Sequence, residues 1–179
     1  MNDWHAQIRE AVAEVLPDLG RLSAHQRYSD VIPRANRPAT DRQIVSYEQY
    51  LGLRLPPSYR AFLELHNGYE WLAFPGHMLS IQDVVPGGEY FDDIKEWKTV
   101  MAEAGLSEAL DGIVVAYLDQ PNNWAYLDPN RARDGGEFDL ALHVSGVDPS
   151  IYPTVVEFIR SAAERARLAL TWVERSAKG

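Results

Sequence analysis

The sequence predicts an α+β fold in which a small central antiparallel β-sheet is flanked by helices. Two short amphipathic segments, 40–51 and 57–66, have the apolar spacing of helices. The run IVVAYL at 113–118 is β-branched and almost continuously apolar, as is typical of a buried strand, and turn residues follow it. Residues 154–175 carry a long helical stripe. Helices therefore surround a sheet near the centre of the chain.

The length of the chain, 179 residues, predicts a single domain over 1–179. Within it we expect an N-terminal helix and connection at 1–39 and a core at 40–173. A chain of this size buries about two-thirds of its surface on folding. The absence of cysteine excludes disulfides, thiolate nucleophiles and cysteine metal sites.

The N-terminal residues suggest a cytoplasmic protein. The first sixteen residues lack the basic segment and apolar core of a signal peptide. No apolar run approaches the roughly 18 residues of a membrane span. We therefore expect no membrane contact.

The net charge of −9 is concentrated in one segment. Residues 80–140 contain 13 acidic side chains against four basic ones, and the rest of the chain is balanced. A phosphate backbone requires the opposite sign, so we do not expect direct binding of nucleic acid. An acidic surface suits a basic protein partner, by steering and complementarity. The alternative is a surface that only keeps the protein soluble.

The first forty residues predict one helix and a connection. Asn2 or Asp3 can cap a helix with an apolar stripe, which we expect to run to about Leu16, where Pro17 stops it. The following residues, 17–39, have no clear period and predict a surface connection. A short strand or turn is expected within it at 28–32.

The segment 40–71 predicts two helices joined by an extended link. Thr40 and Gln43 have the spacing of a capping box. Gly52 stands where a left-handed residue ends the first helix, and Pro57 suits the first turn of the second. Asn67-Gly68 is expected to end the second helix.

The middle of the chain predicts a strand, a helix and a hairpin. Residues 78–81 form a short apolar run, which we expect to be the first strand. A helix up to Gly105 follows, with Asp92, Asp93 and Glu96 on its polar face. The strand at 113–118 pairs with 124–127 across a polar turn, which predicts a hairpin.

The last third predicts a turn, a loop, a strand and the longest helix. Asp128-Pro129-Asn130 is expected to turn, and the charged residues 131–137 to form an exposed loop. Residues 140–144 predict a strand. Thr154 and Glu157 predict a second capping box, which begins the helix 154–175, with Trp172 on its core stripe.

An ordered set of short motifs resembles the signature of the SUKH superfamily, which includes SMI/KNR-like domains. The family signature is an acidic helix followed by LG, LP, SYR, FL and NG, and its residues are structural. The matching residues here are Leu51, Gly52, Leu55, Pro56, Tyr59, Phe62, Leu63, Asn67 and Gly68. The family's later strand, polar turn, second strand and closing helix match the pattern down to residue 173. The resemblance therefore covers about 40–173 and leaves the N-terminal residues without a role.

The titratable residues give no catalytic pattern. The five histidines lack the paired spacing of a metal site, so we expect no metal and no cofactor. Carboxylate pairs such as Asp92-Asp93 arise by chance in an acidic segment. Because no motif places a nucleophile beside a base, we expect no enzyme.

The resemblance implies a binding protein. Bacterial members of the superfamily are immunity proteins, which neutralise polymorphic toxins, often nucleases. We expect an acidic surface to cover the basic active-site region of a cognate toxin. The expected contacts are Glu89, Asp92, Asp93, Glu96, Asp119, Asn122, Asn123, Trp124, Asp134 and Glu137. Two alternatives stay open: an intracellular scaffold or regulator, like the fungal regulator of cell-wall synthesis, and, less favoured, a small hydrolase.

Overall fold

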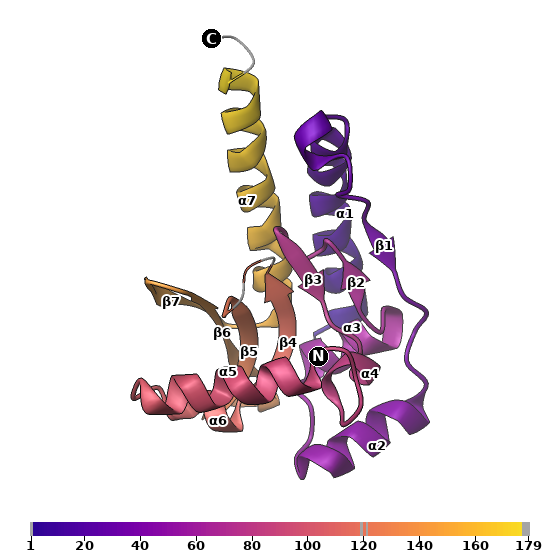
Figure 1. Ribbon diagram of the computed structural model, residues 1–179. Helices are drawn as coiled ribbons and strands as arrows, with labels where there is room; N and C mark the ends of the chain where they lie inside the picture. The colour runs from indigo at the N-terminus through magenta and orange to yellow at the C-terminus, as the bar shows by residue number, and fades with distance from the viewer. Residues whose placement is uncertain (1, 119, 121, 177–179) are drawn as a thin grey trace.

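The structure confirms the predicted α+β class. It is a computed structural model that describes residues 2–118, 120 and 122–176 (Figure 1). These residues form a seven-stranded antiparallel sheet with its strands in chain order. The strands are β1 (Arg34–Ala35), β2 (Tyr69–Glu70), β3 (Gly76–Met78), β4 (Ile113–Leu118), β5 (Trp124–Ala132), β6 (Phe138–Val144) and β7 (Val147–Tyr152). The helices are α1 (Trp4–Ser23), α2 (Asp41–Leu51), α3 (Pro57–Leu65), α4 (Ile81–Val84), α5 (Phe91–Glu103), α6 (Glu108–Asp111) and α7 (Val155–Ser176), with 3₁₀ turns η1 (Gln26–Tyr28) and η2 (Asp134–Gly136).

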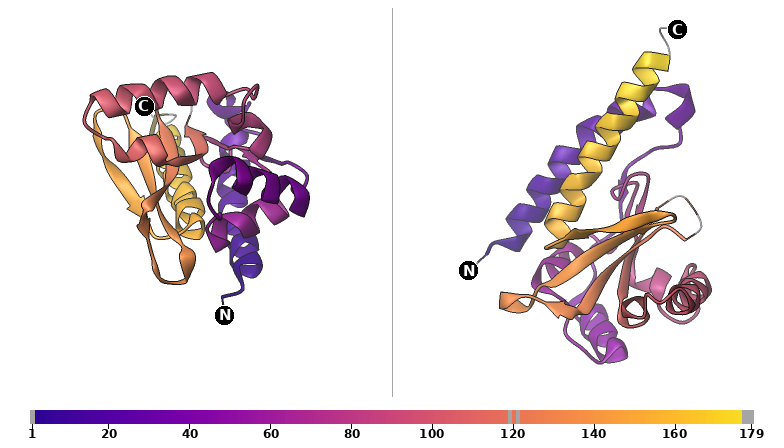
Figure 2. Two further views of the ribbon diagram at one scale, coloured as in Figure 1. Left: turned by 90° about the horizontal axis from the view of Figure 1, so that it is seen from below. Right: turned by 90° about the vertical axis from the view of Figure 1, so that its left-hand side faces the viewer.

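Helices cover the two faces of the sheet. Helices α1 and α7 run side by side on one face, and α5 lies across the other (Figures 1 and 2). The alternation of side chains along β5 explains this arrangement, because successive residues point to opposite faces. Trp124 and Tyr126 both contact Trp97 of α5, with ring centroids 6.2 and 5.6 Å apart. Leu127, of opposite parity, is fully buried.

The two-helix segment forms as predicted. Thr40 and Gln43 make the capping box, and Gly52 ends α2 at φ 71°. Helix α3 begins at Pro57 and ends before Gly68, whose φ is 90°. The signature residues Tyr59, Phe62 and Leu63 are fully buried, which agrees with a structural role.

Polar contacts within this segment hold its two helices together. The buried carboxylate of Glu48 accepts a hydrogen bond from the N–H of Leu55 at 3.0 Å. Arg60 of α3 pairs with Glu48 at 3.3 Å and with Glu64 at 3.0 Å, and it also pairs with Asp41. One guanidinium therefore connects the start and the end of α2 to α3.

The predicted end of the first helix is wrong, because α1 continues through Pro17 to Ser23. Leu19 and Leu22 are fully buried, and Asp18 pairs with Arg167 of α7 at 2.8 Å. A proline inside a helix costs about 3 kcal/mol relative to alanine. Packing of the last turns of α1 against α7 outweighs that cost.

Several strand predictions need correction. The run at 78–81 is not a strand, because β3 ends at Met78 and α4 begins at Ile81; β3 is also preceded by two short strands. Asp128-Pro129-Asn130 does not turn, because β5 passes through it to Ala132 with an irregular register opposite β6. The last strand, β7, was not predicted. The hairpin of β4 and β5 and the helix α5 are confirmed.

The C-terminal helix α7 is confirmed, with one correction on its stripe. Trp172 is 49% exposed, not buried in the core, and the guanidinium of Arg27 lies 4.4 Å from its ring centroid. Residues of α1 and α7 belong to the same buried apolar cluster as the sheet. Within the described residues, no helix has both the length and the apolarity to cross a membrane.

Candidate functional site: an acidic helix face

Helix α5 separates apolar from acidic side chains around its axis. Ile94, Trp97 and Met101 are buried against the sheet. Asp92, Asp93 and Glu96 are exposed on the opposite side, as predicted, and Glu89 is exposed just before the helix. We call these four carboxylates, Glu89, Asp92, Asp93 and Glu96, the acidic face of α5.

The acidic face carries charge that the rest of the protein does not compensate. Among the described residues, none of its four carboxylates forms an ion pair, whereas ten other acidic side chains do. Glu10 and Glu14 of α1, for example, both pair with Arg160 of α7. The carboxylates of Glu10 and Glu14 connect α1 to α7, whereas those of the acidic face are exposed to solvent.

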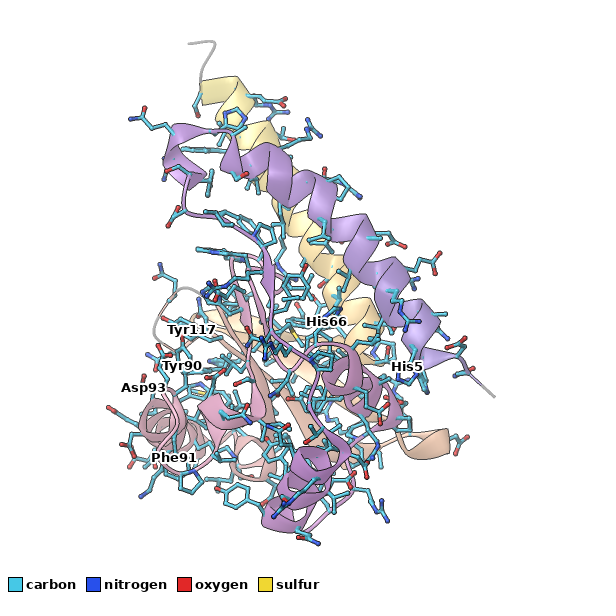
Figure 3. All side chains as sticks on the ribbon, turned by 90° about the vertical axis from the view of Figure 1, so that its right-hand side faces the viewer. His5, His66, Tyr90, Phe91, Asp93 and Tyr117 are labelled. Carbon is cyan, nitrogen blue, oxygen red and sulfur yellow. The ribbon has the colours of Figure 1, made fainter. Side chains whose placement is uncertain are left out.

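Aromatic rings support the start of α5. The ring of Tyr90 lies 5.3 Å from that of Tyr117 and 6.1 Å from that of Trp124. Tyr117 and Trp124, paired across β4 and β5, are 4.9 Å apart. Tyr90, Tyr117 and Asp93 lie on the same side of the molecule (Figure 3). The aromatic contacts of Tyr90 therefore hold the start of α5 against the hairpin of β4 and β5.

The protonation behaviour of Tyr90 reports the electrostatic field at this site. Burial raises the pKa of Tyr90 to about 12, with smaller contributions to that value from Glu89, Asp83, Tyr117 and Asp93. Negative charge next to the hydroxyl opposes its ionisation. The start of α5 is therefore a region of negative potential with a neutral phenol at its base.

Trp124 is a packing residue, and its expected exposure at the turn is wrong. It is 3% exposed and lies between the rings of Tyr90 and Trp97. Trp124 begins β5, and its ring packs against Trp97 of α5. It supports the acidic face and has no free surface for a partner.

The hairpin turn between β4 and β5 contains three further predicted contacts. Asp119 lies outside the described residues. Asn122 is exposed, with φ of 72°. The side-chain oxygen of Asn123 accepts a hydrogen bond from the N–H of Ser145 at 2.9 Å, which connects this turn to the one between β6 and β7.

Asp134 and Glu137 lie at the other end of β5, away from the hairpin turn. Nine residues of strand separate the two ends, which corresponds to roughly 30 Å. Asp134 is exposed in η2. The expected exposure of Glu137 is wrong, because it is 5% exposed and bound to Ser58. The predicted contacts that the structure describes therefore do not form one surface, and the acidic residues among them gather mainly at α5.

Tyr90 and Tyr117 were not among the predicted contacts. Both are partly buried aromatic residues next to the acidic face. A usable signal was present for Tyr90, which follows Glu89 directly and precedes two aspartates. For Tyr117 the signal was weaker, because it lies within an apolar strand and only the hairpin register brings it to α5.

The histidines and carboxylates do not gather into a metal site in the described part of the chain: no group of three or more is placed to hold an ion. His5 lies 2.9 Å from Glu64, and His66 packs against Phe62 and Tyr69. Burial lowers the pKa of His66, with Arg9 adding to the effect, so its imidazole is neutral near pH 7.

Comparison with protein families finds one match. The description of the SMI1 / KNR4 family (SUKH-1) fits residues 38–172, well over half of the chain. The matched region includes α2, α3, α5 and the sheet from β2 onwards, and it leaves out α1. No curated protein matches the sequence.

Proposed function

Because the chain belongs to the SMI1 / KNR4 family (SUKH-1), we propose that it is a non-catalytic binding protein that recognises a basic protein partner. The observation that carries the proposal is the acidic face of α5. Its four exposed carboxylates gather at one helix and have no ion-pair partner among the described residues, whereas ten other acidic side chains are paired. A basic surface would supply the missing charges.

The partner that suits this surface best is a cognate toxin domain, which makes the protein an immunity protein. An enzyme that acts on nucleic acid needs a basic surface around its active site, because it must bind phosphates. An acidic helix is complementary to such a surface. Inhibition would follow from occlusion, since the bound helix prevents the substrate from reaching the site.

The geometry of α5 favours fast association. Charges at the rim of an interface act mainly on the association rate, because they steer the encounter. The acidic side chains lie on a helix of 13 residues whose inner face is fixed by Trp97. The carboxylates therefore present a fixed pattern of charge before the partner arrives.

The experiment is capture of the partner from the native cell with two matched variants. One variant neutralises the acidic face through Asp92→Asn, Asp93→Asn and Glu96→Gln. The control neutralises Asp30→Asn, Asp148→Asn and Glu164→Gln, which are exposed and without an ion pair within the described residues. Both variants change the net charge by the same amount.

The wild type and the control variant should capture the same basic protein, identified by mass spectrometry, and the α5 variant should lose it. For a toxin, expression of that protein should arrest cells, and coexpression of the wild type but not the α5 variant should protect them. Capture of a neutral or acidic protein, or equal capture by both variants, would contradict the proposal. A basic partner without toxicity would favour the scaffold alternative.

A further inference from the structure

A cleft lies beside α5, on the side that faces α2. Its volume is about 260 Å³. The residues that matter for its chemistry are Tyr47, Tyr50, Phe91, Ile94, Lys95 and Lys98. We call it the Tyr50 cleft. Helix α2 packs on α3 and α4, and the cleft occupies the space between α2 and α5.

The walls of the Tyr50 cleft are aromatic and apolar. Tyr47 and Ile94 are almost fully buried, and Phe91 is partly buried. Tyr50 is 52% exposed, and its ring lies nearly parallel to that of Tyr47, with centroids 6.3 Å apart. Sites for drug-sized ligands hold roughly 300–1,000 Å³. This smaller cleft, with its flat aromatic walls, has room for an aromatic side chain.

The rim of the cleft is basic, although the surrounding segment is acidic. The chain has only three lysines, at 95, 98 and 178, against 14 arginines, and two of the three line this cleft. The ammonium of Lys98 donates to the carbonyl of Leu110 at 2.9 Å. Burial lowers the pKa of Lys98, and Asp111 opposes this shift.

Lys95 is the cation that remains available. It is exposed and forms no ion pair with any residue that the structure describes, even though Asp92 is three positions away on the same helix. An exposed ammonium beside an apolar cleft complements a group that has both a ring and a negative charge. The positive charge of the rim therefore favours an aromatic group that has a negative charge beside it over a purely apolar group.

We propose that the Tyr50 cleft holds an aromatic side chain of the protein partner and that a carboxylate next to it pairs with Lys95. The inference rests on the proposed function for the existence of a protein partner. In protein interfaces, aromatic anchors in pockets contribute most of the binding energy, and charges at the rim contribute mainly to the rate. The acidic face would steer the partner, and the cleft beside it would anchor the partner.

The test uses a capped peptide as a probe, so that it does not depend on finding the partner. The amide resonances of ¹⁵N-labelled protein are followed during titration with acetyl-Gly-Phe-Asp-Gly-amide. Resonances of Tyr50, Lys95 and Lys98 should shift and saturate. The peptide with Asn in place of Asp should bind roughly two- to fivefold more weakly, which is the range of an exposed ion pair. The peptide with Ala in place of Phe should not saturate the cleft.

Two pairs of variants show whether the named residues are responsible. Lys95→Gln should remove the difference between the Asp and Asn peptides, and Lys95→Arg should keep it. Tyr50→Ala should weaken binding of both peptides, and Tyr50→Phe should not. Both positions are exposed, so the variants should fold.

The outcomes separate this inference from the proposed function. The variant with a neutralised acidic face should still bind the peptide while losing the basic partner. The inference is overturned if the cleft resonances do not saturate or if the Asp and Asn peptides bind equally. It is also overturned if 3-phenylpropionate binds and the peptide does not, because the cleft is then a site for a small molecule.

Discussion

The carboxylate of Glu137 accepts hydrogen bonds from both donors of Ser58, the backbone N–H at 2.7 Å and the hydroxyl at 2.6 Å. The N–H of Val155 in turn donates to the Ser58 hydroxyl oxygen at 3.4 Å. Ser58 is in the first turn of α3, and Val155 begins α7. One buried acid therefore connects the starts of two helices to the residue that precedes strand β6.

Removal of this carboxylate should destabilise the fold. Glu137→Ala leaves two buried donors of Ser58 without an acceptor, at about 1–3 kcal/mol for each. We expect a total loss of about 2–6 kcal/mol in the free energy of unfolding, measured by urea denaturation. Asp134→Ala, in the exposed turn three residues earlier, should change stability by less than about 0.5 kcal/mol. Equal effects of the two substitutions would show that the Glu137 contact is not formed.

The same carboxylate should make the stability of the protein depend on pH in a predictable direction. Burial raises the pKa of Glu137, the hydrogen bonds from Ser58 offset part of that effect, and Glu157 adds to it. The unfolded chain ionises this group at about pH 4.3. Because the folded pKa is the higher one, the favourable contribution is complete below pH 4.3 and is lost as pH rises through the folded pKa.

Comparison with Glu137→Gln isolates this contribution, because glutamine does not titrate. The stability of the variant relative to the wild type should improve as pH rises from about 4 through the raised pKa. Denaturation curves for both proteins between pH 4 and pH 7 measure the difference. A relative stability that falls with pH would mean that the native pKa of Glu137 is depressed.

Burial of the signature residue Phe62 should make it one of the most sensitive positions. Its side chain is fully buried and lies next to that of Tyr59, with ring centroids 6.4 Å apart. Phe62→Ala should lower the free energy of unfolding by about 3–5 kcal/mol. Leu168→Ala, on an exposed face of α7, serves as the control and should be nearly neutral. An unchanged melting temperature for Phe62→Ala would contradict the packing described.

Pro17 inside α1 offers a stabilising substitution. The residue is exposed, so Pro17→Ala loses little packing and restores a backbone donor inside the helix. Proline also restricts the unfolded chain, which offsets part of this benefit. We therefore expect the free energy of unfolding to rise by about 1–3 kcal/mol. Gly20→Ala, on the same helix and with open space at its Cβ, should gain about 0.5–1 kcal/mol. A lower melting temperature for Pro17→Ala would mean that the helix requires the proline.

Local patterns predicted the elements whose apolar residues repeat along a single segment. The stripes of α2, α3, α5 and α7 and the hairpin of β4 and β5 were found in this way. The acidic side of α5 was predicted for the same reason, because helical spacing separates Asp92 and Asp93 from Ile94 and Trp97.

The remaining features depend on contacts between distant segments, which local patterns do not contain. Proline should have ended α1 at Leu16, but burial of Leu19 and Leu22 continues the helix. Glu137 is 79 positions from its partner Ser58, so its burial left no local signal. Strand β7 includes Asp148 and Pro149 and is exposed along most of its length, which is the pattern of an edge strand and resembles a loop.

The salt dependence of association shows whether the acidic face of α5 recognises the partner. The association rate with the captured partner is measured by stopped flow over a range of ionic strength, for the wild type and for the variant with Asp92→Asn, Asp93→Asn and Glu96→Gln. The Debye length is about 8 Å at physiological salt, so steering by exposed charges is strongly screened there. The wild-type rate should fall steeply with salt, and the variant should associate more slowly with a shallower dependence. Identical rates and slopes for the two proteins would show that the acidic face of α5 does not recognise the partner.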